Sequence, residues 1–239
     1  MSDAGGGKAR GAFERRVALG LVVFALCSFA LGLWAAMTDR GSLDPAPDGR
    51  GRSAVGHGGL LGVLEALDVP VERRRTAPTG TVGAVTLVLS PAWRDLDATA
   101  RRAQAARIQA LAEEGPVIVS LPRFRAVADA RPDEARALRP DAEAAAHTLE
   151  VLGLAGQLAV TAAPAEGPGA LPVAVHEGFQ VLEGAALTPV ITAGSGTLLG
   201  RRGGLWVLAD PTPLMNLGLG QAANGAFAMD LLARAGVGV

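Results

Sequence analysis

The chain has 239 residues, and 49% of them are hydrophobic, so it is long and apolar enough to bury a core of ordinary size. Its net charge of −1, with basic residues scattered along the chain, argues against nucleic acid as a partner. The single cysteine, Cys27, excludes an internal disulfide and any metal site built from several cysteines.

An uncharged apolar segment, Val17–Met37, predicts a membrane anchor. At about 1.5 Å per residue, a helix of this length spans roughly the 30 Å hydrocarbon core of a bilayer. The alternative is a cleaved signal peptide, whose apolar region is usually about 7–15 residues long. Basic residues precede the segment, so the positive-inside rule predicts that residues 1–16 are cytoplasmic and the remainder extracytoplasmic. The expected location is the cell (inner, cytoplasmic) membrane, with the lipid bilayer as a partner.

The segment after the anchor is predicted to be a linker. Residues 38–52 are rich in Gly, Pro and Asp and lack apolar periodicity, as flexible linkers do. Residues 53–239 then alternate between helical and strand patterns, which predicts one extracytoplasmic α/β domain.

Three continuous apolar strands are expected to form the parallel core of this domain. They are Ala84–Ser90, Pro116–Leu121 and Leu205–Ala209, and such runs are typical of strands covered on both faces. A shorter strand is expected at 69–73. Helices are expected near residues 58–68, from a cap at Asp97 to Gly115, from 141 to Gly153, and over 220–236.

Between Gly156 and Arg201 the pattern changes to short strands separated by Gly and Pro, including one at 171–176. This spacing is typical of antiparallel hairpins. The fold class predicted from the residues is therefore α/β, with a parallel-core sheet that carries a β-rich antiparallel segment.

Common catalytic and cofactor motifs are missing from the sequence. The glycine-rich stretch at 56–62 lacks the spacing and the Lys-Ser/Thr of a phosphate loop, although a helix start there could still bind an anion. His57, His147 and His176 form no zinc motif. Ser195, in the stretch AGSGT, lacks the first glycine of the G-x-S-x-G nucleophile elbow and fits a hairpin turn. We therefore expect no metal, no cofactor and no catalytic residues.

Three polar residues end the predicted core strands. In an open parallel sheet, ligands bind outside the carboxyl ends of the strands, so Ser90, Ser120 and Asp210 are expected to line one edge. The same residue types also end strands and cap helices. Asp210 precedes Pro211, a favoured first helical residue, so we expect its carboxylate to accept a hydrogen bond from the Thr212 N–H. On that account, replacing Asp210 with Asn costs little stability.

Three stretches of the chain resemble a bacterial membrane-protein family, the domain of unknown function 4350. They are the serine-led, glycine-rich helix and following strand at 53–75, the strand–helix–strand at 86–122, and the hairpin, strand, Asp-Pro, Asn and final helix at 194–232. The resemblance implies a flavodoxin-like fold, similar to class I glutamine amidotransferase domains. It also places Ser53, Asp210, Asn216 and Asn224 on recurrent polar positions of the family. In that family a glycine usually stands at the position of Asp68.

The resemblance also carries an expectation about function. An amidotransferase needs a cysteine nucleophile, and the only cysteine lies in the predicted anchor, so amidotransferase activity is expected to be absent. Genes for proteins of this type tend to lie beside those for MoxR-type ATPases and von Willebrand-type membrane proteins, which suggests envelope protein partners. We therefore expect a non-enzymatic binding or scaffolding component. The alternative is an extracytoplasmic serine-type hydrolase that uses Ser120 or Ser90 with His147 or His176 as base.

Overall fold

A computed structural model describes residues 56–72, 84–91, 93, 96–126, 138–175 and 177–237. They all belong to one compact unit, Asp44–Val239. The predicted anchor, the linker, Ser53 and His176 lie outside the described residues. Within the described part of the chain, no helix is both long and apolar enough to span a bilayer.

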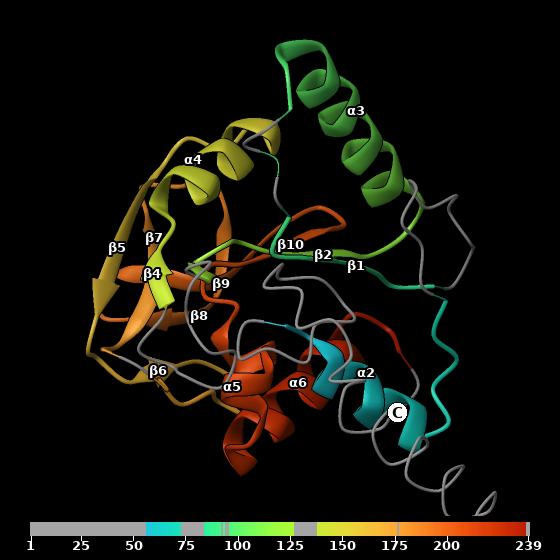
Figure 1. Cartoon of the computed structure of the whole chain (residues 1–239), viewed down its shortest axis with the longest axis vertical. Coiled ribbons are helices and arrows are strands. Elements are labelled where there is room, and N and C mark those ends of the chain that lie inside the picture. Colours follow the sequence, from blue (N-terminus) through green and yellow to red (C-terminus); the bar gives the residue numbers. More distant parts are fainter. Residues whose placement is uncertain are drawn as a thin grey trace, which may run out of the picture. The chain divides into compact units, whose positions relative to one another are not determined.

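The protein is a mixed α/β structure built on an open eight-stranded sheet (Figure 1). Its parallel part consists of β1 (Thr86–Leu89), β2 (Val117–Ser120) and β10 (Leu205–Leu208). β2 lies between the other two and pairs in parallel with both. These are the three predicted core strands, so the prediction of a parallel core is confirmed.

The rest of the sheet is antiparallel. The strand order is β1-β2-β10-β9-β7-β5, and β8 pairs with both β9 and β6. The predicted β-rich segment between Gly156 and Arg201 is thereby confirmed. The strands are β5 (Gln157–Thr161), β6 (Ala165–Glu166), β7 (Phe179–Glu183), β8 (Thr188–Ala193) and β9 (Gly196–Arg202), and a separate ribbon pairs β3 (Phe124–Ala126) with β4 (Leu138–Pro140).

Two predicted strands do not form. Residues 69–72 and 171–175 adopt no strand, although each contains alternating valines. The backbone N–H of Val173 instead donates to the side chain of Asn224, so this segment is held by the last helix and not by a neighbouring strand. An alternating pattern of apolar residues forms a strand only where a neighbouring strand can pair with it.

Helices cover both faces of the parallel strands (Figure 1). One face carries α3 (Ala98–Glu114) and α4 (Ala142–Val151), and the opposite face carries α2 (Gly58–Ala66), α5 (Asn216–Leu219) and α6 (Ala222–Arg234). α3 begins at the predicted cap, where the Asp97 carboxylate accepts a bond of 2.7 Å from the Ala100 N–H, and it ends at Gly115.

The strand residues divide into two hydrophobic clusters because side chains alternate across a sheet. Val117 and Val119 of β2 pack in the cluster that contains α3 and α4. Ile118, between them, packs in the cluster that contains α2 and α6. Every residue of β2 and β10 is buried, as expected for strands covered on both faces. β1 was expected to be covered in the same way, but it is only partly buried, because it is the outermost strand at its end of the described sheet.

Candidate functional site

The carboxyl ends of the parallel strands form the candidate site, because they bring together polar residues from distant parts of the chain. Leu89 of β1 and Leu208 of β10 both pair with Ser120 of β2, so Ser90 and Ala209 follow it on either side. The Ser90 N–H donates to the Ser120 side-chain Oγ at 2.9 Å. Both serines are buried. The prediction that Ser90 and Ser120 lie together at the carboxyl ends of the parallel strands is confirmed.

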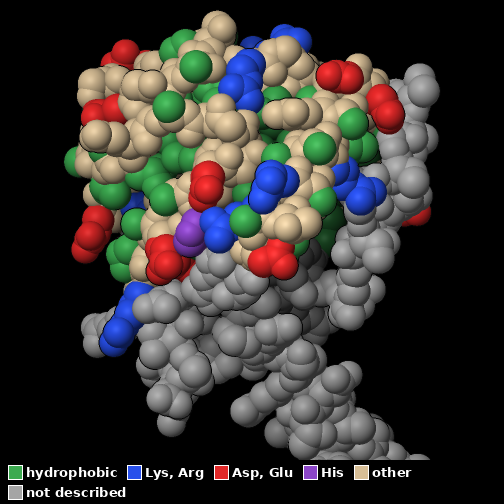
Figure 2. Space-filling model, turned by 90° about the horizontal axis from the view of Figure 1, so that it is seen from above, with side chains coloured by type: hydrophobic (Ala, Val, Ile, Leu, Met, Phe, Trp, Pro, Cys, Tyr) green, Lys and Arg blue, Asp and Glu red, His purple; other side chains and the backbone are tan. Residues whose placement is uncertain are grey.

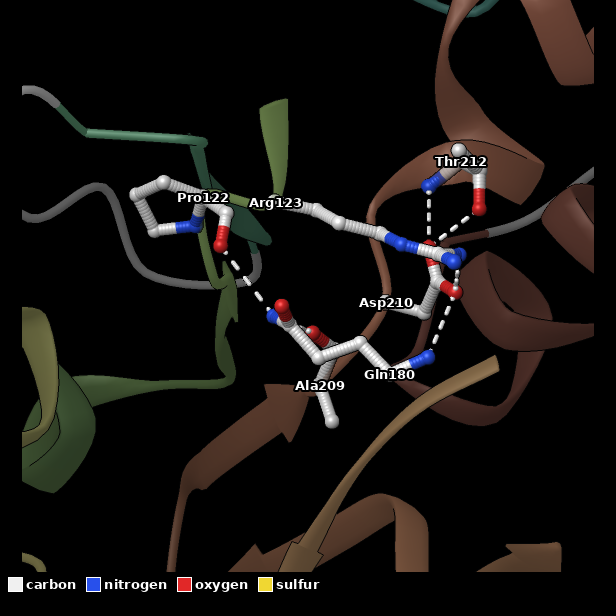
Figure 3. A network of polar contacts seen from close by, with 6 residues as sticks. All are labelled: Pro122, Arg123, Gln180, Ala209, Asp210 and Thr212. Carbon is white, nitrogen blue, oxygen red and sulfur yellow. Dashed lines mark hydrogen bonds and ion pairs between the residues drawn. The ribbon is translucent and has the colours of Figure 1, made fainter. Parts of the chain in front are cut away.

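Asp210 is completely buried and accepts four hydrogen bonds (Figure 3). Its Oδ1 accepts the Thr212 N–H at 2.9 Å and also the Thr212 hydroxyl. Its Oδ2 accepts the Gln180 backbone N–H at 2.9 Å and an Nη1 hydrogen of Arg123. The predicted bond from the Thr212 N–H is confirmed. The prediction that Asp210 caps a helix beginning at Pro211 is wrong. A single 3₁₀ turn, η3 (Thr212–Leu214), follows with Pro211 at its cap position, and α5 begins only at Asn216.

Arg123 is the partner that the sequence did not reveal. It lies three residues beyond β2 and 87 residues before Asp210, and its side chain is only 5% exposed. Its guanidinium carbon lies 4.7 Å from the centre of the Phe124 ring, so a cation–π contact accompanies the ion pair. The residues around Arg123 in the sequence do not indicate that it forms a buried ion pair, because its partner lies on another strand and is brought near only by the strand order.

Gln180 joins this cluster to the antiparallel part of the sheet (Figure 3). It lies on β7, and its side-chain Nε2 donates to the carbonyl oxygens of Ala209 at 2.7 Å and Pro122 at 3.1 Å. The chain segments that leave β2 and β10 are therefore bonded to the same glutamine. This arrangement satisfies backbone carbonyls that would otherwise be buried without a donor.

A second buried contact joins His57 to Ser90. His57 lies just before α2, and its Nδ1 is 3.1 Å from the Leu214 carbonyl oxygen. Because a carbonyl only accepts, Nδ1 carries a hydrogen, and in the neutral ring Nε2 can accept the Ser90 hydroxyl hydrogen at 3.4 Å. Ser90 has φ +44°, a left-handed conformation that is rare outside glycine. A serine beside a histidine base is a catalytic arrangement in many hydrolases.

The surroundings of this Ser–His contact do not supply the remaining parts of a nucleophile elbow. In such elbows, the N–H of the residue after the nucleophile helps to bind the oxyanion. That residue here is Pro91, which has no N–H. The N–H of Ser90 itself already donates to both the Oγ and the backbone carbonyl of Ser120. His57 and Ser90 are also 0% and 2% exposed, which leaves little room for a substrate.

The histidines proposed as bases have other surroundings. His147 lies on α4, and its Nδ1 is buried without a hydrogen-bond partner. Among the described residues, no hydrogen bond joins it to Ser90 or Ser120. His176 lies outside the described residues. Among the described residues, the serine and histidine whose side chains are within hydrogen-bonding distance are Ser90 and His57, a pair that was not predicted from the sequence.

The two predicted asparagines hold neighbouring segments together. The Asn216 side-chain Oδ1 accepts the Gly59 N–H at 2.6 Å, and the backbone N–H of Asn216 donates to the Gly56 carbonyl at 2.8 Å. The buried Asn224 side chain accepts the Val173 N–H and donates to the Gly218 carbonyl. The Gly59 N–H, one of the free donors on which an anion site at the start of α2 would depend, is therefore already bonded.

Within the part of the chain that the structure describes, no three His, Cys, Asp or Glu residues are arranged to hold a metal ion. On the face shown in Figure 2, described acidic and basic side chains are intermixed and do not gather into a patch of one sign. Comparisons with protein-family models, with curated proteins and with solved structures find no match to this chain.

Proposed function

We propose that this protein is a membrane-anchored, extracytoplasmic α/β domain that acts as a non-catalytic binding or scaffolding component of a cell-envelope assembly. The observation that carries the proposal is the closed network around Asp210. At the strand ends, where an α/β enzyme presents its reactive groups, the carboxylate is buried and accepts bonds from three different residues. Such a carboxylate is engaged in holding the chain together.

The location rests on the sequence. Val17–Met37 is the proposed anchor, with the N-terminus inside and the α/β domain outside. A flavodoxin-like or class I glutamine amidotransferase-like topology, and membership of the domain of unknown function 4350 family, belong to the same proposal. They are supported by the parallel arrangement of β1, β2 and β10 and by the helices on both faces. The only cysteine, Cys27, precedes this α/β unit, so no amidotransferase reaction is proposed.

A serine-type hydrolase is the second candidate, and one observation favours it. Ser90 has a strained backbone at a strand end, and its hydroxyl lies 3.4 Å from Nε2 of His57. The other ring nitrogen, Nδ1, is bonded to the Leu214 carbonyl oxygen. The candidate ranks second because Pro91 provides no oxyanion donor and because both side chains are buried.

Affinity purification of the tagged full chain from detergent-solubilised membranes tests the first proposal. Proteins held by the full chain are compared with those held by residues 1–52 alone, which carry only the predicted anchor and linker. We expect defined envelope proteins that require residues 53–239. Recovery of the same proteins with both baits, or of none, would contradict a scaffolding role for the α/β domain.

Hydrolysis of p-nitrophenyl acetate distinguishes the second candidate. We expect the full chain and Ser90→Ala to hydrolyse the ester equally slowly. Ser195→Ala is the matched control, because Ser195 is an exposed hairpin serine bonded to Glu183. A hydrolysis rate that falls with Ser90→Ala and with His57→Gln, but not with Ser195→Ala, would establish the hydrolase in place of the scaffold.

A further inference from the structure

β5 is an edge strand of the sheet that the described residues form. β5 pairs with β7 on one side, and no described strand pairs with it on the other (Figure 1). Natural proteins usually protect such edges with charges, prolines or bulges. β5 has the sequence QLAVT, which contains no charge and no proline, and its pairing with β7 is in regular register. Its Val160 is 60% exposed, more than any other large hydrophobic residue in the described part of the chain.

The bonding pattern of β7 shows which backbone groups of β5 face outward. In an antiparallel pair, the N–H and C=O of one residue point to the same side, and the side alternates from residue to residue. Gln180 pairs with Val160, but its N–H donates to Asp210, away from β5. The Val160–Gln180 pair is therefore not hydrogen-bonded. It follows that Leu158 and Val160 direct their N–H and C=O groups outward, whereas Ala159 bonds to β7.

We propose that two copies of this chain pair through β5, antiparallel, about a two-fold axis that passes beside Ala159. In this register Leu158 of one copy and Val160 of the other exchange backbone hydrogen bonds across the interface. In this register apolar side chains of one copy lie opposite apolar side chains of the other, and polar side chains lie opposite polar ones. Leu158 faces Val160 on one face of the sheet, and Gln157 faces Thr161 on the other, with Ala159 facing itself between them.

Physical complementarity favours a second copy over a different partner. A neutral strand meets itself without repulsion between like charges, and the symmetric pairing covers the exposed Val160 with an apolar residue of the other copy. The two sheets would then continue across the axis. This association is independent of the envelope partner proposed above, because it uses only groups of β5.

Disulfide trapping in the full chain, in detergent and with Cys27→Ala as background, tests both the pairing and its register. Directly opposed residues of a non-hydrogen-bonded pair have Cα atoms about 4.5 Å apart, within the range of a disulfide. Ala159→Cys should therefore give an oxidised dimer in nearly all of the protein. Thr161→Cys on the same face should not, because its two copies would be about 14 Å apart along the strands.

Charge at the edge supplies a second measurement. Adding Val160→Lys to Ala159→Cys should abolish the cross-link, because the ammonium group would be placed against Leu158 of the other copy. Val173→Lys is the matched control, since Val173 is an exposed valine outside the strand, and it should leave the cross-link unchanged. Melting temperatures of all variants show whether they fold. A folded Ala159→Cys chain that stays monomeric, or cross-linking that survives Val160→Lys, would overturn the proposal.

Discussion

Arg123 and Asp210 form a buried ion pair that joins the carboxyl ends of two neighbouring parallel strands, β2 and β10. Their side chains are 5% and 0% exposed, so neither charge is solvated by bulk water. The pair stands at the centre of a cluster that also holds Gln180 and the turn at Thr212. Removing one partner of a buried pair is far more costly than losing a helix cap.

Asp210→Asn is therefore expected to destabilise the protein strongly, contrary to the expectation from capping alone. The amide would leave the Arg123 charge buried without a counter-ion, a change that costs about 3–5 kcal/mol in other proteins. Thr212→Val, which removes only the hydroxyl bond to Asp210, should cost about 1 kcal/mol. Urea unfolding measures both. A loss below about 1 kcal/mol for Asp210→Asn would show that the ion pair contributes little.

A double-mutant cycle isolates the ion pair from its surroundings. Arg123→Met and Asp210→Asn are each expected to cost several kcal/mol, because each leaves a buried charge without its partner. The double variant removes both charges at once, so it should be more stable than the sum of the single losses predicts. The free energies of unfolding of the four proteins give the coupling energy. Additive losses would mean that the two residues act independently.

The left-handed backbone of Ser90 predicts an inverted order of two substitutions. In most positions Gly is less stable than Ala by about 0.5–1 kcal/mol. At Ser90, with φ +44°, a side chain costs about 1–2 kcal/mol of backbone strain that glycine avoids. Both variants lose the hydroxyl beside His57, so their comparison isolates the backbone. We expect Ser90→Gly to melt at a higher temperature than Ser90→Ala, and the usual order would contradict this conformation.

Gly153 and Gly225 provide a second test of how backbone conformation decides whether glycine or alanine is the more stable residue. A Cβ added at Gly153 or at Gly225 would meet no atom within 4 Å. Gly225 lies inside helix α6, where alanine is favoured, so Gly225→Ala should stabilise the protein by about 0.5–1 kcal/mol. Gly153 follows α4 with φ +61°, so Gly153→Ala should destabilise it by about 1 kcal/mol. Thermal unfolding should show shifts of opposite sign.

Asp68 adopts a left-handed backbone conformation that is usually occupied by glycine. It follows α2 with φ +55°, a left-handed conformation in which helices commonly end at a glycine. Aspartate tolerates this conformation better than most residues do, because its short side chain can bond locally. The left-handed turn is therefore present without the glycine that usually marks it.

The sequence by itself determined the elements whose signals are local. The three core strands were predictable because their apolar runs are continuous. The cap at Asp97 and the bond from the Thr212 N–H to Asp210 were predictable because a carboxylate reaches a backbone N–H two or three residues ahead. The change to antiparallel hairpins after Gly156 follows from the spacing of Gly and Pro. These features depend on residues that are neighbours in the chain.

Only the tertiary structure decided which distant residues meet. The strand order places β2 between β1 and β10, and that order, not any local pattern, brings Arg123 to Asp210 and Ser120 to Ser90. It also leaves β1 partly buried, although its sequence resembles that of a doubly covered strand. Contacts between residues 30 to 157 positions apart depend on how the elements pack, and packing energy belongs to pairs of surfaces that no single segment contains.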